Sequence, residues 1–203
     1  STMTNKRPFP QENGISFGIR PSRPQEELNS ELSSFYNSWK SEYLKASVSY
    51  PNCYYISTGG GTNVKAEAIT VSEGHGYGMI SVVLMAGEDK GAKKIFDGLF
   101  TFFREHPSDI APELPSWQVL GKVGDHETGE TFASATDGDL DVAYSLLLAD
   151  NQWGSEGEIN YREEAAKVID AIYRFDIHPE SKRILLGDWV PGDETEEKYR
   201  NST

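Results

Sequence analysis

Apolar residues recur along this chain at spacings that predict several helices. Between residues 25 and 46 they return every three or four positions, which predicts an amphipathic helix with a stripe of Leu28, Leu32, Phe35, Trp39 and Tyr43. Residues 72–86 and 137–151 are apolar almost all round, which is typical of buried helices. Residues 89–106 and 161–176 are apolar on one face, and we expect these two helices to lie at the surface.

This order alternates a buried helix with an amphipathic one, which is typical of a ring of helical hairpins with inner and outer helices. We therefore expect an all-α fold. Two or three hairpins do not close such a ring, so the chain looks like part of a larger barrel. Residues 1–22 are rich in proline and glycine and predict an extended lead-in, with the folded domain at 23–203. Residues 107–134 form a long irregular excursion of the kind that often carries function.

The charge excludes some classes of partner. The chain has 203 residues and a formal net charge of −13, with 19 acidic and 7 basic side chains in residues 124–203. A polyanion would be repelled, which disfavours nucleic acid as a partner. No apolar run approaches the ~20 residues that a membrane helix needs, so we expect no membrane partner. The first residues, Ser1-Thr2-Met3, have no signal-peptide pattern, and we interpret them as residues left by cloning ahead of a mature sequence.

Metal and cofactor chemistry finds little support in the residues. The single Cys53 rules out an intrachain disulfide and a cysteine-based metal cluster. The four histidines are scattered, without a metal-binding spacing. The carboxylates of residues 135–141 suggest calcium, but Val142 and Leu148 stand where an EF-hand needs glycine and glutamate. We expect no metal and no cofactor.

Two segments combine acidic groups with glycines at the start of a buried helix. The first segment is Ser72-Glu73-Gly74-His75-Gly76-Tyr77-Gly78-Met79. Each glycine in a helix costs ~1 kcal/mol of stability, so we expect the close approach of a ligand or of another helix to offset this cost. Glu73, beside an apolar run that would keep it protonated, is a candidate general acid; the alternative is a charge that complements the helix dipole. The second segment is Ala135-Thr136-Asp137-Gly138-Asp139-Leu140-Asp141, whose acids could equally be an ordinary helix start.

Tryptophans are the remaining candidates for binding. Trp39 lies on the stripe of the first helix, and we expect it in the core. Trp117 and Trp189 lie in predicted loops, where a flat indole can stack on a sugar ring.

Together the two acidic segments resemble glycoside hydrolase family 8, a family of endoglucanases, chitosanases, lichenases and some xylanases. Further agreement comes from Trp153-Gly154-Ser155, Ile159-Asn160-Tyr161 and Leu186-Gly187-Asp188-Trp189, and Val142 is a mild departure. The resemblance spans about residues 25–200 and implies an (α/α)6 barrel, of which this chain is the N-terminal half. It implies that residues 23–203 are part of the catalytic domain of a secreted enzyme.

The resemblance also implies an endo-acting reaction with inversion at β-1,4-linked polysaccharide. Glu73 matches the general acid, and Asp137 matches the acid that holds the sugar at the cleavage point. Trp117 and Trp189 match stacking platforms, Tyr77 lines the cleft, and Asp139 is expected to border it. The catalytic base is not found in this chain, so either a second polypeptide completes the barrel or the chain is a fragment with little activity.

The substrate rests on weaker signals. The acidic second half suits a polycationic glucosamine polymer, so we expect chitosan first, with possible β-glucan activity. An endo-β-1,4-glucanase (cellulase or lichenase) is the second expectation. A rival of another class is a non-catalytic carbohydrate-binding half-barrel that keeps the tryptophans without hydrolysis.

Overall fold

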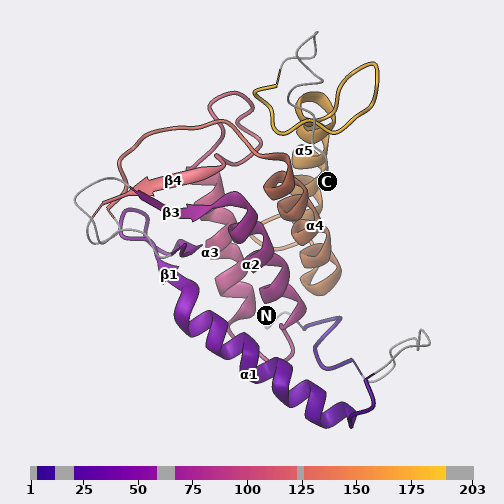
Figure 1. Ribbon diagram of the computed structural model, residues 1–203. Coiled ribbons are helices and arrows are strands. Elements are labelled where there is room, and N and C mark those ends of the chain that lie inside the picture. Colours follow the sequence, from indigo (N-terminus) through magenta and orange to yellow (C-terminus); the bar gives the residue numbers. More distant parts are fainter. Residues whose placement is uncertain (1–3, 12–20, 59–66, 123–125, 191–203) are drawn as a thin grey trace.

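The computed structural model describes residues 4–11, 21–58, 67–122 and 126–190, which form a largely helical structure (Figure 1). Its helices are α1 (Gln25–Tyr43), α2 (Ser72–Leu84), α3 (Ala92–Glu105), α4 (Thr136–Trp153) and α5 (Tyr161–Ala171), the last continued by a π-helical turn (Ile172–Asp176). Its strands form two antiparallel pairs: β1 (Leu44–Ala46) with β2 (Tyr54–Ile56), and β3 (Glu67–Val71) with β4 (Gln118–Gly121). No helix in the described ranges is long and apolar enough to cross a membrane.

Helices α2 and α4 lie side by side and parallel at the centre of the structure (Figure 1). Two glycines bring their first turns close together. A Cβ atom on Gly138 would lie 2.2 Å from Ser72 Oγ, and one on Gly76 would lie 2.8 Å from Asp141 Cβ. Near the other end, Gln152 Nε2 donates to Val83 O at 3.2 Å. The glycines therefore allow one helix to approach another closely, which is one of the two explanations expected from the sequence.

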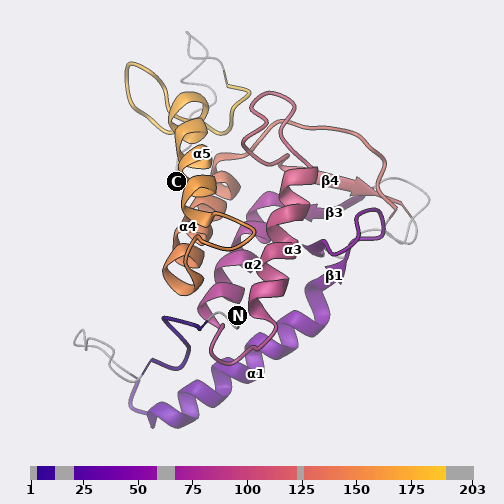
Figure 2. The ribbon, with the colours of Figure 1, turned by 180° about the vertical axis from the view of Figure 1, so that it is seen from behind.

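Each central helix is covered by the helix that follows it. Helix α3 packs on α2 and lies in front of it in Figure 2, and α5 packs on α4. The shared core is apolar and fully buried; it includes Met79, Val82, Phe96, Leu99 and Leu146. This is the predicted alternation of inner and outer helices, and the helix starts and ends lie within a few residues of those predicted.

The N-terminal segment lies against the opposite ends of α2 and α4. Lys6 N donates to Gln152 O at 2.9 Å, and Trp153 Nε1 donates to Asn5 Oδ1 at 2.8 Å. Gly87 sits directly under this segment, since a Cβ atom there would lie 2.2 Å from Phe9 O. Residues 4–11 thus tie the start of the chain to both central helices.

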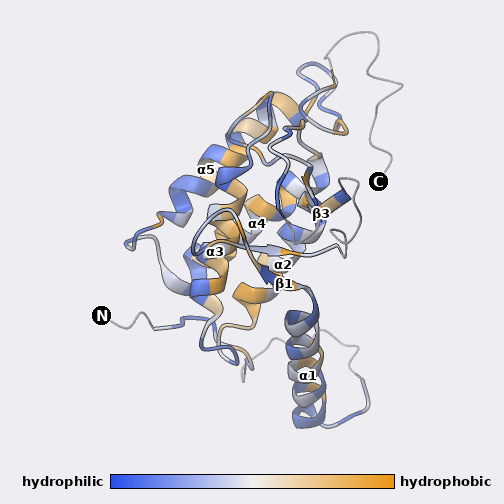
Figure 3. Ribbon diagram, turned by 90° about the vertical axis from the view of Figure 1, so that its left-hand side faces the viewer, coloured by the Kyte–Doolittle hydropathy of each residue, from blue (hydrophilic) through white to orange (hydrophobic). Residues whose placement is uncertain are grey.

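Helix α1 is less buried than its apolar stripe predicts. Tyr36 is its one buried side chain among the residues described, and its hydroxyl donates to Asp89 Oδ2 at 2.7 Å. Leu32 and Phe35 are exposed, with 70% of Phe35 accessible. Figure 3 shows α1 projecting from the rest of the structure, so part of its stripe faces solvent here.

The strands were only partly predicted. Strand character around residues 53–56 is confirmed by β2. Strand β3, directly before α2, was not predicted, and neither was β4 inside the excursion at 107–134. The pairing places Val71 opposite Gln118 and so holds the start of α2 against the excursion.

Glycine-to-alanine substitutions in the central pair should have opposite effects on stability at two positions. Gly138→Ala forces its methyl group onto the backbone and side chain of Ser72, and we expect a loss of ~1–3 kcal/mol. Gly74→Ala is the matched control, because a Cβ atom there meets only Val71 Cγ2 at 3.8 Å, and alanine should be neutral or up to ~1 kcal/mol stabilising. Urea unfolding of the two variants tests this; equal effects would contradict the close-packing explanation.

Candidate functional site

The N-terminal ends of α2 and α4 open at the same end of the structure, where the excursion at 107–134 and the segment at 184–190 cross them. Ser72 N donates to Trp117 O at 2.9 Å, and Trp117 N donates to Ala133 O at 2.8 Å. On the α4 side, Thr136 N donates to Leu186 O at 2.9 Å, and Thr136 Oγ1 donates to Leu185 O at 2.6 Å. The excursion and the segment at 184–190 are thereby fixed around the two helix starts.

Glu73 lies in the first turn of α2 with an exposed side chain. It lines an open hollow together with Tyr77, one turn further along and 64% accessible. The apolar run beside Glu73 was expected to desolvate its side chain, but in the described part of the chain the side chain is exposed and the hollow is open to solvent. Its place at a helix N-terminus does favour a negative charge or a bound polar group.

Asp137 and Asp141 bring two more carboxylates to the same end. Asp137 is exposed in the first turn of α4, where its Oδ1 accepts from Gly138 N at 2.8 Å. Asp141 lies beside Gly76 and also lines the hollow. Partial burial raises the pKa of Asp141, and the negative charges of Asp137 and Glu73 raise it further. The two helix starts therefore hold three acidic groups close enough to influence one another.

Trp117 and Trp189 lie on the segments that cross this end, with 40% and 41% of their surfaces accessible. Trp117 meets Phe132 edge to face, with ring centroids 6.2 Å apart. Trp189 follows Asp188, which anchors its segment: Asp188 Oδ1 accepts from Ser134 N at 2.8 Å, and Oδ2 accepts from Ala111 N at 3.1 Å. Both indoles are thus held by backbone hydrogen bonds and present part of their surface to solvent.

Asp139 does not border the open end, which corrects the expectation from the sequence. Its side chain has no accessible surface and points to the inner side of α4. The reason is helical geometry: residues two apart lie about 200° apart around a helix, so Asp137 and Asp139 occupy opposite faces. Asp141, four residues after Asp137, returns to the same face.

Three residues at the hollow were not predicted as site residues. Trp39 is half-buried rather than in the core and lines the hollow with Tyr43, both from α1. Their spacing of four residues, on the stripe already noted, was a signal that one helix face presents both rings. Asp141 could have been assigned to the site because it follows Asp137 by four residues and so lies on the same helix face.

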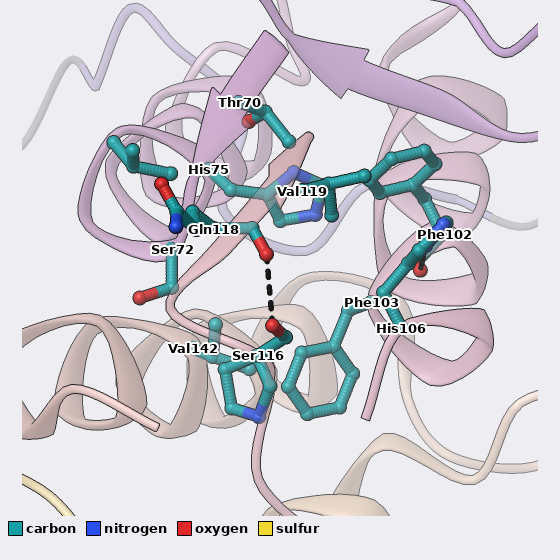
Figure 4. Close-up of a pocket in the computed structure, with 12 residues that line it drawn as sticks. Thr70, Ser72, His75, Phe102, Phe103, His106, Ser116, Gln118, Val119 and Val142 are labelled. Atoms are coloured by element: carbon teal, nitrogen blue, oxygen red, sulfur yellow. Dashed lines mark hydrogen bonds between the residues drawn. The ribbon is translucent and has the colours of Figure 1, made fainter. Parts of the chain in front are cut away.

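A second, small cavity of about 20 Å³ lies behind the start of α2 and is shown in Figure 4. Its lining combines apolar groups with His75 and the hydroxyls of Thr70, Ser72 and Ser116. Among the described residues that line it there is no carboxylate. In the described residues, no three histidine, cysteine, aspartate or glutamate side chains are placed to hold a metal ion. The acidic end with its exposed aromatic rings is therefore the better candidate site.

Comparison with known proteins identifies the family. The model of glycosyl hydrolases family 8 matches residues 35–199, which is most of the chain. The chain belongs to glycosyl hydrolase family 8. The resemblance inferred from the sequence motifs is confirmed, and the family fold is an (α/α)6 barrel.

Relatives in family 8 are about twice as long as this chain. A β-glucanase of Niallia circulans is 39% identical over 199 residues, which make up 97% of this chain and 45% of the relative. An endoglucanase of Bacillus sp. (strain KSM-330) is 44% identical over 188 residues, 90% of this chain and 40% of the relative. The chain thus spans less than half of either protein.

Solved structures agree with this picture of a half-barrel. The apo structure of a β-1,3-1,4-glucanase from Paenibacillus sp. X4 superposes with a TM-score of 0.81 and 39% identity, over 96% of this chain and 49% of that one. A cold-adapted family 8 xylanase superposes with a TM-score of 0.62 at 19% identity, which supports the fold alone. The described helices are therefore about half of the family 8 barrel.

His75, in the glycine-rich segment of α2, should make the chain sensitive to acid. Its Nε2 lies 2.7 Å from Leu99 O, its ring stacks on Phe102, and burial lowers its pKa to about 4. In the unfolded chain histidine binds a proton near pH 6.5, so folding loses up to ~1.4 kcal/mol per pH unit as pH falls from about 6.5 to 4.

Chemical denaturation at pH 7, 5.5 and 4.5 measures this loss. His75→Gln keeps an amide donor for Leu99 O and removes the titrating group, so its stability should fall less between pH 7 and 4.5 than that of the unsubstituted chain. The same slope in both proteins would show that His75 is not the group responsible.

Proposed function

We propose that this chain supplies the general acid and part of the sugar-binding surface of an endo-acting, inverting β-glucanase. The observation that carries the proposal is the pair of adjacent helix starts, which present Glu73 and Asp137 beside exposed aromatic rings. Membership of a glycosyl hydrolase family and the glucanase names of its relatives support it.

In this proposal Glu73 donates a proton to the leaving glycosidic oxygen, and Asp137 accepts hydrogen bonds from the sugar at the cleavage point. Trp117, Trp189 and Tyr77 contribute flat faces for sugar rings. An inverting reaction also needs a carboxylate base ~6.5–9.5 Å from the acid, with water between them. We assign that base to the other half of the family 8 barrel.

We place β-glucan ahead of chitosan, which reverses the order expected from the charge. The relatives are named as a β-glucanase, an endoglucanase and a β-1,3-1,4-glucanase. Excess acidic charge attracts a cationic polymer, but many enzymes that act on neutral polymers are acidic too. A secreted location remains a prediction from the sequence.

The remaining half of a family 8 barrel is the partner we propose for this chain. Apolar side chains are exposed on α1, on α2 and on α4. Leu32 and Phe35 of α1 line one hollow with Leu84 of α2, and Leu140, Tyr144 and Leu147 are exposed on α4. Exposed apolar surface of this extent marks an interface. The solved Paenibacillus glucanase is about twice the length that this chain covers, so a second half exists there to bury such a surface.

Glu73→Gln should abolish hydrolysis while leaving glucan binding in place. Loss of the proton donor should lower kcat ~10²–10⁴-fold because general acid catalysis contributes that much. The assay measures reducing ends released from lichenan, carboxymethyl cellulose and chitosan by the 203-residue chain together with the complementary half of the Paenibacillus glucanase. Glu88→Gln, an exposed acid beyond the far end of α2, is the matched control and should be as active as the parent.

Two outcomes would contradict this assignment. Equal rates for Glu73→Gln and the parent would remove Glu73 as the acid. Glucan binding by the parent without release of reducing ends, in the presence of the second half, would favour the carbohydrate-binding fragment instead.

Lysine substitutions on the exposed apolar surface should prevent assembly with the second half without unfolding the chain. Phe35→Lys and Leu84→Lys each place a charge on this surface, and we expect co-purification with the complementary half to fall at least ~10-fold, because a desolvated unpaired charge costs several kcal/mol. Ile110→Lys is the control, since Ile110 is exposed in the loop after α3. Circular dichroism checks that all three variants are folded; assembly that survives both substitutions would contradict the interface.

A further inference from the structure

Two carboxyl groups lie fully buried on the inner side of α4. Asp139, in the first turn of α4, and Asp176, the last residue of the π-helical turn, each have 0% accessible surface. None of their four carboxyl oxygens accepts a hydrogen bond of ordinary geometry from a donor in the described residues. The two carboxyl groups lie close to each other, with the carboxyl of Asp188 and the hydroxyls of Ser134 and Thr136 around them.

The fold brings the two residues together through rare local geometry. A π-helical turn inserts one extra residue into the end of a helix, and such turns are frequent at functional sites. Here the turn ends at Asp176, whose backbone oxygen accepts from Leu185 N at 2.8 Å. The same residue thus contacts α4 through its side chain and the 184–190 segment through its backbone.

Electrostatics forbids two negative charges at this place. Burial raises the pKa of Asp139 well above its usual range, and the carboxyl of Asp176 raises it further. Burial also raises the pKa of Asp176, to about 6. Asp188, from the 184–190 segment, adds a further negative charge, and the hydroxyls of Ser134 and Thr136 only partly offset these effects.

We propose that Asp139 and Asp176 share one proton at neutral pH, and that this O–H···O bond positions the start of α4 against the 184–190 segment. Asp139 donates and Asp176 accepts. The bond links two parts of the candidate site, because Asp137 lies two residues before Asp139 and Trp189 lies on the segment bonded to Asp176. The pair is a positioning device, and its bearing on glucan binding rests on the proposed function.

The sign of the pH dependence follows from the raised values. Both carboxyls ionise near pH 4 in the unfolded chain and at higher pH in the folded chain, so the folded state binds more protons between them. The contribution to stability is complete below about pH 4 and falls as pH rises through about 6 and beyond. This is opposite to the effect of His75, whose buried neutral ring favours folding at higher pH.

Carbon-13 NMR of the chain labelled at aspartate Cγ tests the shared proton directly and needs no activity. We expect one aspartate carboxyl to titrate near pH 6 and another to remain protonated at pH 7. The signal of the protonated carboxyl should be absent in Asp139→Asn and present in Asp170→Asn, an exposed control on α5. Ionisation of every aspartate by pH 5 would overturn the proposal.

Rescue by the isosteric amide separates positioning from simple packing. Asp139→Asn keeps a donor toward Asp176, so at pH 7 its Tm should stay close to that of the parent and change less between pH 6 and 8. Asp139→Ala removes the carboxyl partner of Asp176 and should lose stability at every pH in that range. Equal losses in the two variants would contradict a hydrogen-bonding role.

In the assembled barrel, the asparagine variant should keep the parent's KM for glucan at pH 8, and the alanine variant should raise it ~10-fold. If no glucan is hydrolysed by any protein, the proposed function fails while the NMR result still decides the shared proton.

Discussion

The close parallel packing of α2 and α4 is the constraint on which the rest of this structure depends. Gly76 and Gly138 let the two backbones approach, and the approach is closest at the helix starts. A parallel pair places both sets of free N–H groups, and both positive dipole ends, at one end of the structure. The acidic residues gather at this end because it favours negative charge, and the segments that cross it satisfy part of the backbone.

Helical periodicity then divides the acidic residues of α4 into two groups with different chemistry. Asp137 is exposed and Asp141 is half-buried, and both lie on the outward side of the helix, within reach of water. Asp139 faces inward, where a carboxyl must keep a proton or find a cation. One short stretch of sequence thus supplies a group suited to hold a sugar and a group suited to hold the helix itself. The two roles differ because residues two positions apart point about 200° apart around the helix axis.

The helices and the position of Glu73 could be predicted from the sequence because they depend on local patterns. Apolar spacing defines a helix within a few residues, and the glycine-rich segment marks where two helices meet. Strands β3 and β4 were missed because each is short and exists only through pairing between residues about fifty positions apart. Asp139 was placed at the open end because acids at alternate positions look equivalent in the sequence, whereas a helix turns them to opposite faces. Trp39 was placed in the core because a stripe shows that a face is apolar without showing what covers it.

Missing cover also explains why the central helices are both more apolar and more exposed than the helices of a complete domain. An inner helix of a closed ring has neighbours on two sides as well as an outer helix behind it, so nearly every face is apolar. In the described chain α2 and α4 are each other's neighbour, and α1 covers only part of the outer side of α2. Leu84 and Tyr144 are exposed for this reason, and Phe35 continues the same surface onto α1. The apolar pattern of these helices therefore reflects a ring larger than the part present, and agrees with relatives about twice as long.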